Sequence, residues 1–179
     1  MASSNENLHA TMESTFKAFL ECYPQSVRAK DPSLLLTMLA PECVRYLKPE
    51  SFLAKHPFVK ASETNAEYEA HMAPEIVLME EARGKILDIV VDPAKRKLSA
   101  RVEHWIKLIG KDQPSTLEIC WFVDLTEDGK KISRIVEFID TYVATKMAED
   151  LAGKGFNTAA KDRDSIFTFT TARGVVGDS

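Results

Sequence analysis

Three titratable residues in the second half of the chain stand where acid–base chemistry would need them. His104 is the polar residue on an otherwise apolar alternating face of segment 97–109. In segment 131–142, Glu137 lies between Ile135 and Ile139 on one alternating face. Burying such groups is unfavourable unless they are paired or take part in proton transfer. Asp140 lies near the end of the second segment on the opposite parity. We predict that Glu137 or Asp140, together with His104, transfers protons.

Two of these residues also have a structural interpretation that the sequence leaves open. His104 could be a core histidine bonded to a carbonyl. Asp140 could cap the helix that we expect after it, because an aspartate at that position accepts hydrogen bonds from backbone N–H groups.

Residues in the first half of the chain could position a substrate. Adjacent strand residues point to opposite faces, so only one of Arg45 and Tyr46 can point inward. An arginine there could hold an enolate or carboxylate oxygen, or form a surface salt bridge instead. Tyr68 and His71 lie one helical turn apart, and they either line the mouth of a cavity or belong to the core.

Three long apolar segments must form the wall that carries the C-terminal candidates. They span 97–109, 116–126 and 131–142, and Asp128-Gly129 between the last two supplies the backbone angles of a tight hairpin. Such strands form an antiparallel meander that can curve round a small-molecule cavity. The apolar face of segment 116–126 belongs either to the core or to a dimer surface, and the sequence leaves this choice open.

Helical periodicity, caps and prolines divide the rest of the chain. Pro24 is expected to kink or interrupt the first helix. The complete order predicts an α+β fold, with helices packed on one face of a curved, mostly antiparallel sheet. The expected helices span 7–29, 31–39, 64–81 and 142–151, the expected additional strands span 43–47 and 86–91, and a loop is expected over 50–62.

Composition limits the functions to consider. The 179 residues carry a net charge of −4 and are 45% hydrophobic, which is typical of one globular domain and not of a nucleic-acid-binding or membrane protein. We place that domain at 1–153 and treat 154–179 as a tail that could be a lid or an arm. The three cysteines are far apart, as expected for reduced thiols in the cytoplasm. No metal-ligand or phosphate-loop spacing occurs, so we expect no metal and no cofactor.

Several local segments together resemble a known superfamily. They are segment 41–46 with Pro49, segment 65–68 with His71, and the hairpin 127–132 that continues into 136–140. In this order they resemble the SnoaL-like branch of the nuclear transport factor 2-like superfamily, in particular small fungal isomerases and cyclases of secondary-metabolite pathways. The likeness spans about 8–147.

The resemblance implies a cone-shaped α+β barrel, often a homodimer, and a function. That function is a cofactor-independent isomerase, cyclase or dehydratase that acts on an apolar polyketide- or terpenoid-type intermediate. The alternative is a binding or scaffold protein of the same fold without catalysis. Similar fungal sequences often carry Asn, Glu and Tyr where this chain has Leu117, Glu118 and Ile119. We therefore expect Glu118 to contact the substrate in a cavity that is more apolar than in those relatives.

Overall fold

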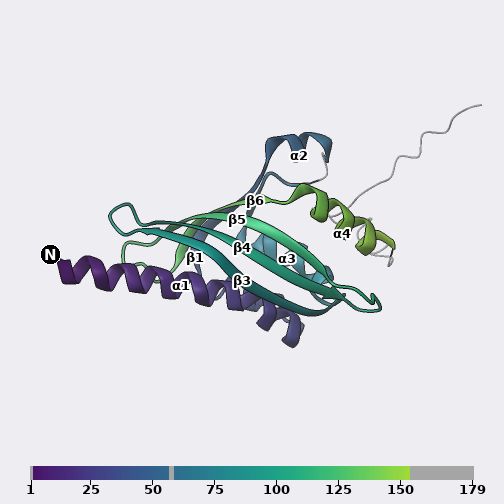
Figure 1. Cartoon of the computed structure of the whole chain (residues 1–179), viewed down its shortest axis with the longest axis horizontal. Coiled ribbons are helices and arrows are strands. Elements are labelled where there is room, and N and C mark those ends of the chain that lie inside the picture. The colour runs from purple at the N-terminus through teal and green to yellow at the C-terminus, as the bar shows by residue number, and fades with distance from the viewer. Residues whose placement is uncertain (1, 57–58, 154–179) are drawn as a thin grey trace, which may run out of the picture.

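The computed structural model describes residues 2–56 and 59–153, which form one curved sheet with helices (Figure 1). The predicted α+β class is confirmed. The strand order is β2-β1-β6-β5-β4-β3, in which β1 and β6 pair in parallel and every other neighbouring pair is antiparallel. The elements are α1 (Ala2–Ala29), the 3-10 helix η1 (Pro32–Leu36), β1 (Leu39–Lys48), α2 (Glu50–Lys55), β2 (Ser62–Thr64), α3 (Asn65–Ile76), β3 (Met79–Asp92), β4 (Lys97–Leu108), β5 (Ser115–Leu125), β6 (Ile132–Ile139) and α4 (Thr141–Gly153).

The hairpin between β5 and β6 turns at the predicted place, with a positive φ at Gly129 but not at Asp128, and it lies against the long helix α1. Gly129 has φ 71°, a backbone conformation that side chains with a Cβ rarely adopt. A Cβ at Gly129 would lie 2.9 Å from Met12 Cγ, so α1 also leaves no room for a larger residue. Thr15 donates a 2.8 Å hydrogen bond to the Gly129 carbonyl. The turn therefore places α1 along the sheet, as Figure 1 shows.

Helix α1 continues past Pro24, so of the two expected effects of this proline an interruption is excluded. Three other expectations about elements were wrong in detail. The expected second helix is a 3-10 helix, with Asp31 as its N-cap. The expected loop over 50–62 contains α2, where the buried Phe52 anchors a short turn of helix. The third helix ends at Ile76 and not near 81, because the chain from Met79 onward pairs along the whole of β4.

Alternation along the strands divides the sheet into a buried and an exposed face. The face of β4 that carries His104 is buried, as predicted. The open question about segment 116–126 is answered in favour of the core, because Leu117, Ile119, Trp121 and the other alternate residues of β5 are buried. The hydrophobic core therefore lies between the inner face of the sheet and the helices.

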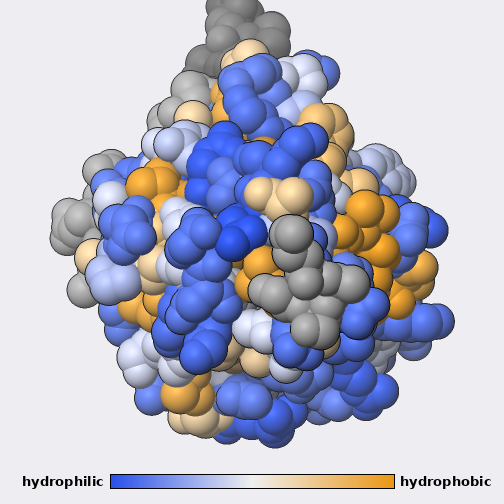
Figure 2. All heavy atoms as spheres, turned by 90° about the vertical axis from the view of Figure 1, so that its left-hand side faces the viewer, coloured by the Kyte–Doolittle hydropathy of each residue, from blue (hydrophilic) through white to orange (hydrophobic). Residues whose placement is uncertain are grey.

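The opposite face of the sheet carries polar pairs and several large apolar residues. Arg101 pairs with Glu118 across β4 and β5, while Phe122 and Phe138 are each 48% exposed. The end of the molecule that carries the start of α1 is mostly hydrophilic, with hydrophobic residues in small separate groups (Figure 2). Among the described residues, no helix combines the length and the apolar character that crossing a bilayer requires.

Candidate active site

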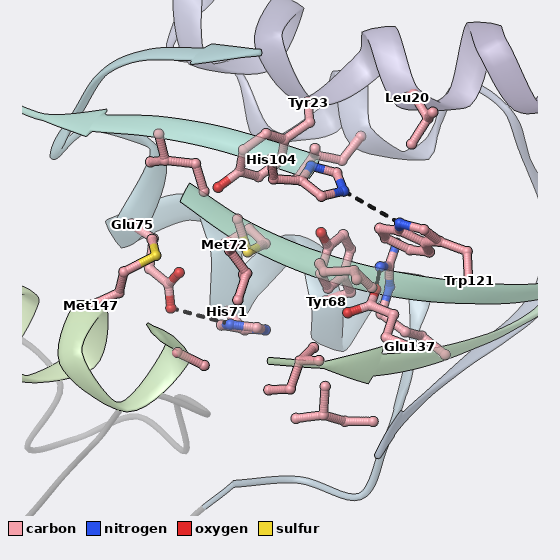
Figure 3. A pocket seen from close by; sticks show the side chains of 18 of the residues that line it. Leu20, Tyr23, Tyr68, His71, Met72, Glu75, His104, Trp121, Glu137 and Met147 are labelled. Carbon is pink, nitrogen blue, oxygen red and sulfur yellow. Dashed lines mark hydrogen bonds and ion pairs between the residues drawn. The ribbon is translucent and has the colours of Figure 1, made fainter. Parts of the chain in front are cut away.

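A cavity of about 130 Å³ lies between the inner face of the sheet and helices α1, α3 and α4 (Figure 3). Its wall is mostly aliphatic and aromatic, and it includes both Leu117 and Ile119, the two positions where polar residues are expected in similar fungal sequences. A few polar side chains interrupt this apolar wall, as in most small-molecule sites. Those with ionisable or hydrogen-bonding groups are Cys22, Tyr23, Arg45, Tyr68, His71, Glu75, His104, Trp121 and Glu137.

Arg45 and Glu137 form a buried ion pair at one end of the cavity. The parallel pairing of β1 and β6 sets them side by side, because Arg45 lies opposite Ile135 and Leu47 lies opposite Glu137. Their side chains are only 9% and 12% exposed. The guanidinium also lies 3.7 Å from the centroid of the Tyr68 ring, a cation–π geometry. Arg45 Nε is buried and has no hydrogen-bond partner among the described residues, so it is an unsatisfied donor.

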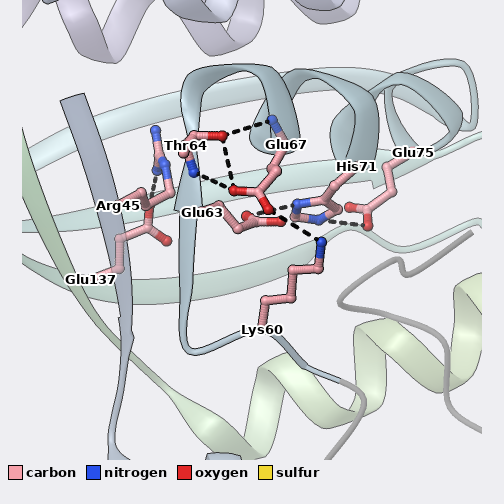
Figure 4. A network of polar contacts seen from close by, with 8 residues as sticks. All are labelled: Arg45, Lys60, Glu63, Thr64, Glu67, His71, Glu75 and Glu137. Carbon is pink, nitrogen blue, oxygen red and sulfur yellow. Dashed lines mark hydrogen bonds and ion pairs between the residues drawn. The ribbon is translucent and has the colours of Figure 1, made fainter. Parts of the chain in front are cut away.

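His71 lies between two carboxylates farther along the same wall (Figure 4). Its Nδ1 is 3.1 Å from Glu63 Oε2, and its Nε2 is 3.2 Å from Glu75 Oε1. All three side chains are at most 5% exposed. Burial alone would lower the pKa of His71, but the two carboxylates outweigh it and raise the pKa to about 9. His71 is therefore an imidazolium near neutral pH, with both ring N–H groups directed at carboxylates.

Glu75 is the member of this cluster that both contacts His71 and lines the cavity. Burial raises the pKa of its carboxyl group, and the nearby His71 charge only partly opposes this effect. His71 Nε2 and Glu75 Oε1 lie 3.2 Å apart, so a proton can pass between them and the two groups titrate as a coupled pair. The couple of His71 and Glu75 is therefore a source of an exchangeable proton at the cavity wall.

A capping box fixes the start of α3, which carries this cluster. The hydroxyl of Thr64 accepts from the Glu67 backbone N–H, and the Glu67 carboxylate accepts from the Thr64 N–H at 2.8 Å. Lys60 lies 3.6 Å from the other oxygen of Glu67. Because Glu63 directly precedes the cap, the cap sets how Glu63 and the first turns of α3 approach each other.

His104 reaches the cavity from β4 as a neutral ring. Burial lowers its pKa to about 4. The indole Nε1–H of Trp121 donates to His104 Nε2 over 3.3 Å. An indole nitrogen is only a donor, so His104 Nε2 must accept and Nδ1 must carry the proton of the neutral ring. His104 therefore presents a fixed N–H donor, rather than an easily protonated base.

The structure brings some of the predicted site residues together. Arg45, Tyr68, His71, His104 and Glu137 all line the cavity. Arg45 is the inward member of the pair on β1 that the sequence left open.

Three predicted site residues lie elsewhere. Tyr46 points to the other face of β1, where its ring lies 5.0 Å from the Arg134 guanidinium. Glu118 lies on the exposed face of β5 beside Arg101 and is not among the cavity residues. Asp140 accepts hydrogen bonds from the Tyr142 and Val143 N–H groups, at 3.0 and 3.2 Å, so it caps α4. Side-chain direction is the physical reason in each case.

Sequence reasoning missed Glu63, Glu75 and the polar edge of Trp121. Glu75 shares a helix face with His71 at a spacing of four residues, so a pairing signal was present. Glu63 lies on a strand of three residues, which is too short to show alternation. Trp121 sits in an unbroken apolar face, which gives no sign that its N–H has a polar partner.

Solved structures with the same architecture support the fold. The pinacolase BvnE from Penicillium brevicompactum superimposes with a TM-score of 0.69 at 16% identity, over 83% of this chain and 99% of that chain. PrhC from Penicillium brasilianum gives 0.69 at 20% identity, over 86% and 94%. A nuclear transport factor 2-like protein of unknown function from Burkholderia pseudomallei gives 0.53 at 12% identity, over 76% and 95%. No family model and no curated protein sequence matches this chain.

These likenesses define the class of fold. The chain has a cone-shaped α+β fold of the nuclear transport factor 2-like type, which it shares with these solved structures. The fold resemblance predicted from the sequence is therefore confirmed. Because the identities are low, the likeness concerns the fold, and the chemistry must be argued from the cavity itself.

Proposed function

We propose that this protein is a cofactor-independent enzyme that moves protons on an apolar small molecule. The observation that carries the proposal is that two clusters of ionisable side chains meet at one apolar cavity. One is the ion pair Arg45–Glu137, and the other is the cluster Glu63–His71–Glu75. Isolated charges are expensive to bury, and such clusters are found mainly where they perform chemistry. Isomerisation, cyclisation and dehydration all require only a placed acid and a placed base.

Each group has a role that follows from its position. Glu75, supplied by His71, is the proton donor, because this couple holds an exchangeable proton at the wall. Glu137 is the proton acceptor, and Arg45 orients both Glu137 and an oxygen of the substrate. The His104 Nδ1–H group is a second donor for the substrate. A well-placed acid or base contributes on the order of 10²–10⁴ in rate.

The class of substrate is also part of the proposal. The wall is largely aliphatic and aromatic, which suits a polyketide- or terpenoid-type molecule with few oxygens. A structure of the same fold is named as a pinacolase, which is consistent with chemistry on an oxygenated carbon skeleton. The genes that neighbour this one would name the intermediates that are available.

Deuterium incorporation provides the test. Purified protein is incubated in D₂O with metabolite extract from a strain that lacks the gene, and products are followed by mass spectrometry. We expect one compound to disappear and to be replaced either by an isomer that carries deuterium or by a dehydrated product that is lighter by one water. Glu75→Gln and Glu137→Gln should each reduce the rate at least about 100-fold.

The matched control is Glu80→Gln, which makes the same chemical change on the surface, where Glu80 pairs with Lys107. This variant should retain the wild-type rate. If the Glu75 and Glu137 variants both turned the compound over at the wild-type rate, the assigned roles would be wrong.

A binding protein of the same fold is the second candidate, and the apolar Leu117 and Ile119 in the wall favour it. In that case the protein would extract a compound from the same mixture and release it chemically unchanged and free of deuterium. A homodimer remains a prediction, and size-exclusion chromatography with light scattering would test it.

A further inference from the structure

The charged side chains of the cavity carry no net positive charge. The positive charge of Arg45 is cancelled by Glu137, its partner in the ion pair. The positive charge of His71 faces Glu63 and Glu75, so this cluster sums to −1, or to zero when Glu75 also holds a proton. A positive sum would require both carboxylates of the cluster to be protonated at once.

The remaining titratable groups in the wall are uncharged near neutral pH. Burial lowers the pKa of His104 to about 4, so the ring is neutral. Burial raises the pKa of both Tyr23 and Tyr68, so their phenol groups keep their protons. An anion that entered this cavity would lose its hydration and would meet no unbalanced cation.

We propose that the cavity takes a neutral, oxygen-bearing ring, rejects carboxylates, and develops positive rather than negative charge on its substrate during the reaction. The carboxylates of the two ion-pair clusters support the second half of this statement, because they can offset a positive charge that develops on the substrate. The rings of Phe19, Tyr68 and Trp121 already face the Arg45 guanidinium, at 5.9, 3.7 and 5.8 Å. The part of the proposal that concerns reaction rests on the proposed function, whereas the part that concerns binding does not.

The volume of the cavity limits the size of the group that enters it. An engineered apolar cavity of about 150 Å³ is known to hold one benzene molecule. The present cavity of about 130 Å³ is of similar size. One six-membered ring therefore fits without rearrangement of the wall, either as a whole ligand or as one ring of a larger substrate.

The arrangement suits acid-initiated loss of water. Glu75, which receives a proton from His71, transfers that proton to the oxygen of a substrate hydroxyl group. The carboxyl O–H bond breaks and a new O–H bond forms on the substrate. The C–O bond then breaks, and water leaves with both electrons of that bond. The carbocation loses a proton from the adjacent carbon to Glu137, and the C–H electrons form a C=C bond. The sum is alcohol to alkene plus water, and the proton on Glu137 returns to the first couple through solvent.

Three ring probes of similar shape test the charge selectivity directly. Benzyl alcohol, benzylammonium and benzoate are titrated separately into the wild-type protein at pH 7, and binding is followed by NMR chemical shifts. We expect benzyl alcohol to bind at millimolar concentration and benzoate to bind at least about tenfold more weakly. Benzylammonium should bind no more weakly than benzoate. The proposal is overturned if benzoate binds as tightly as benzyl alcohol, or if none of the three binds.

A single variant should reverse the selectivity. Glu137→Gln leaves Arg45 without its counter-charge, so benzoate should gain at least about tenfold in affinity while benzyl alcohol changes little. Glu80→Gln removes a charge of the same sign from the surface and should leave all three affinities unchanged. An unchanged affinity for benzoate in a folded Glu137→Gln protein would contradict the charge argument.

The binding result and the turnover result are independent. If benzoate is rejected but no compound in the extract is converted, the proposed enzymatic function fails and the charge selectivity stands. If turnover occurs but benzoate binds best, the enzyme function stands and the positive charge of the reaction is refuted. The wild-type titrations need no variant, so they remain informative even if Glu137→Gln does not fold.

Discussion

The two ends of the cavity both contain buried ion pairs, yet they differ in what their protons can do. At the Arg45–Glu137 end the cation is a guanidinium, which keeps its proton under all physiological conditions. At the other end the cation is His71, an imidazolium that faces two carboxylates and can release its proton. The first end can hold and orient charge, whereas the second can also exchange a proton.

The cavity thus assigns the orientation of charge and the exchange of protons to different residues. Arg45 and Glu137 come from neighbouring parallel strands, so the sheet itself fixes their separation. His71 and Glu75 come from one helix, and Glu63 comes from the short strand before it. A rigid charged pair on strands and a titratable cluster on a helix thus meet across one apolar space, and each can be perturbed separately.

Removal of one partner at the rigid end should have the largest effect on stability. In Glu137→Leu the buried guanidinium of Arg45 loses its counter-charge, and we expect the free energy of unfolding to fall by about 3–5 kcal/mol. Urea denaturation followed by circular dichroism measures this change. A loss well below 1 kcal/mol would show that Arg45 finds another partner or reaches water.

The matched control is the double variant Arg45→Leu/Glu137→Leu, which removes both charges. Apolar replacement of a whole buried ion pair is often neutral, so we expect stability to return to within about 1 kcal/mol of the wild type. This result would confirm that the pair is retained for a reason other than stability. Activity and selectivity should not return in the double variant.

The contribution of His71 to the free energy of unfolding should be lost in the alkaline part of the pH range. The pKa of His71 is about 9 in the folded protein and about 6.5 in the unfolded chain, so its contribution is complete below pH 6.5 and is lost as pH rises through 9. The loss relative to His71→Gln should be on the order of 3 kcal/mol. Denaturation at several pH values measures both proteins. Parallel curves for the two between pH 6.5 and 9 would contradict the assignment.

His104 should change the free energy of unfolding in the acidic part of the pH range. Its folded-state pKa is about 4, below the usual 6.5, so its neutral form is favourable above pH 6.5 and becomes a penalty as pH falls. Between pH 6.5 and 4.5 the wild type should lose roughly 2 kcal/mol more than His104→Phe. Because Glu75 titrates in both proteins, this difference reports on His104. If the imidazole resonance of His104 titrated near pH 6.5 in NMR spectra, the lowered pKa of this residue would be contradicted.

The sequence predicted which residues line the two ends of the cavity better than it predicted which of them form ion pairs. Parity along single strands was enough to place His104 and Glu137 on the inner face, because alternation is a local property. The partnership of Arg45 with Glu137 depends on β1 lying parallel to β6, which is a long-range contact that no local pattern encodes. Glu63 was missed for a related reason, since a strand of three residues shows no period.

Two other predicted site residues, Asp140 and Glu118, lie outside the cavity. Asp140 satisfies the pattern of a base at the end of a strand as well as that of a helix cap, and only the direction of its side chain decides between them. Glu118 was expected in the cavity from a resemblance to other sequences, but alternation along β5 gives the inward positions to Leu117 and Ile119. The general fold was predictable because it rests on long, strongly periodic strands.

The capping role of Asp140 gives the smallest expected effect, and it tests the boundary of the proposed site. Asp140→Ala removes the acceptor for the Tyr142 and Val143 N–H groups, so stability should fall by about 1 kcal/mol. Asp140→Asn retains a capping oxygen and should lose only a few tenths of that value. Neither variant should alter the selectivity among the ring probes or the rate of deuterium incorporation. If Asp140→Asn kept its stability but lost turnover, the Asp140 carboxylate would take part in catalysis, and the proposed site would have to be extended beyond the two clusters.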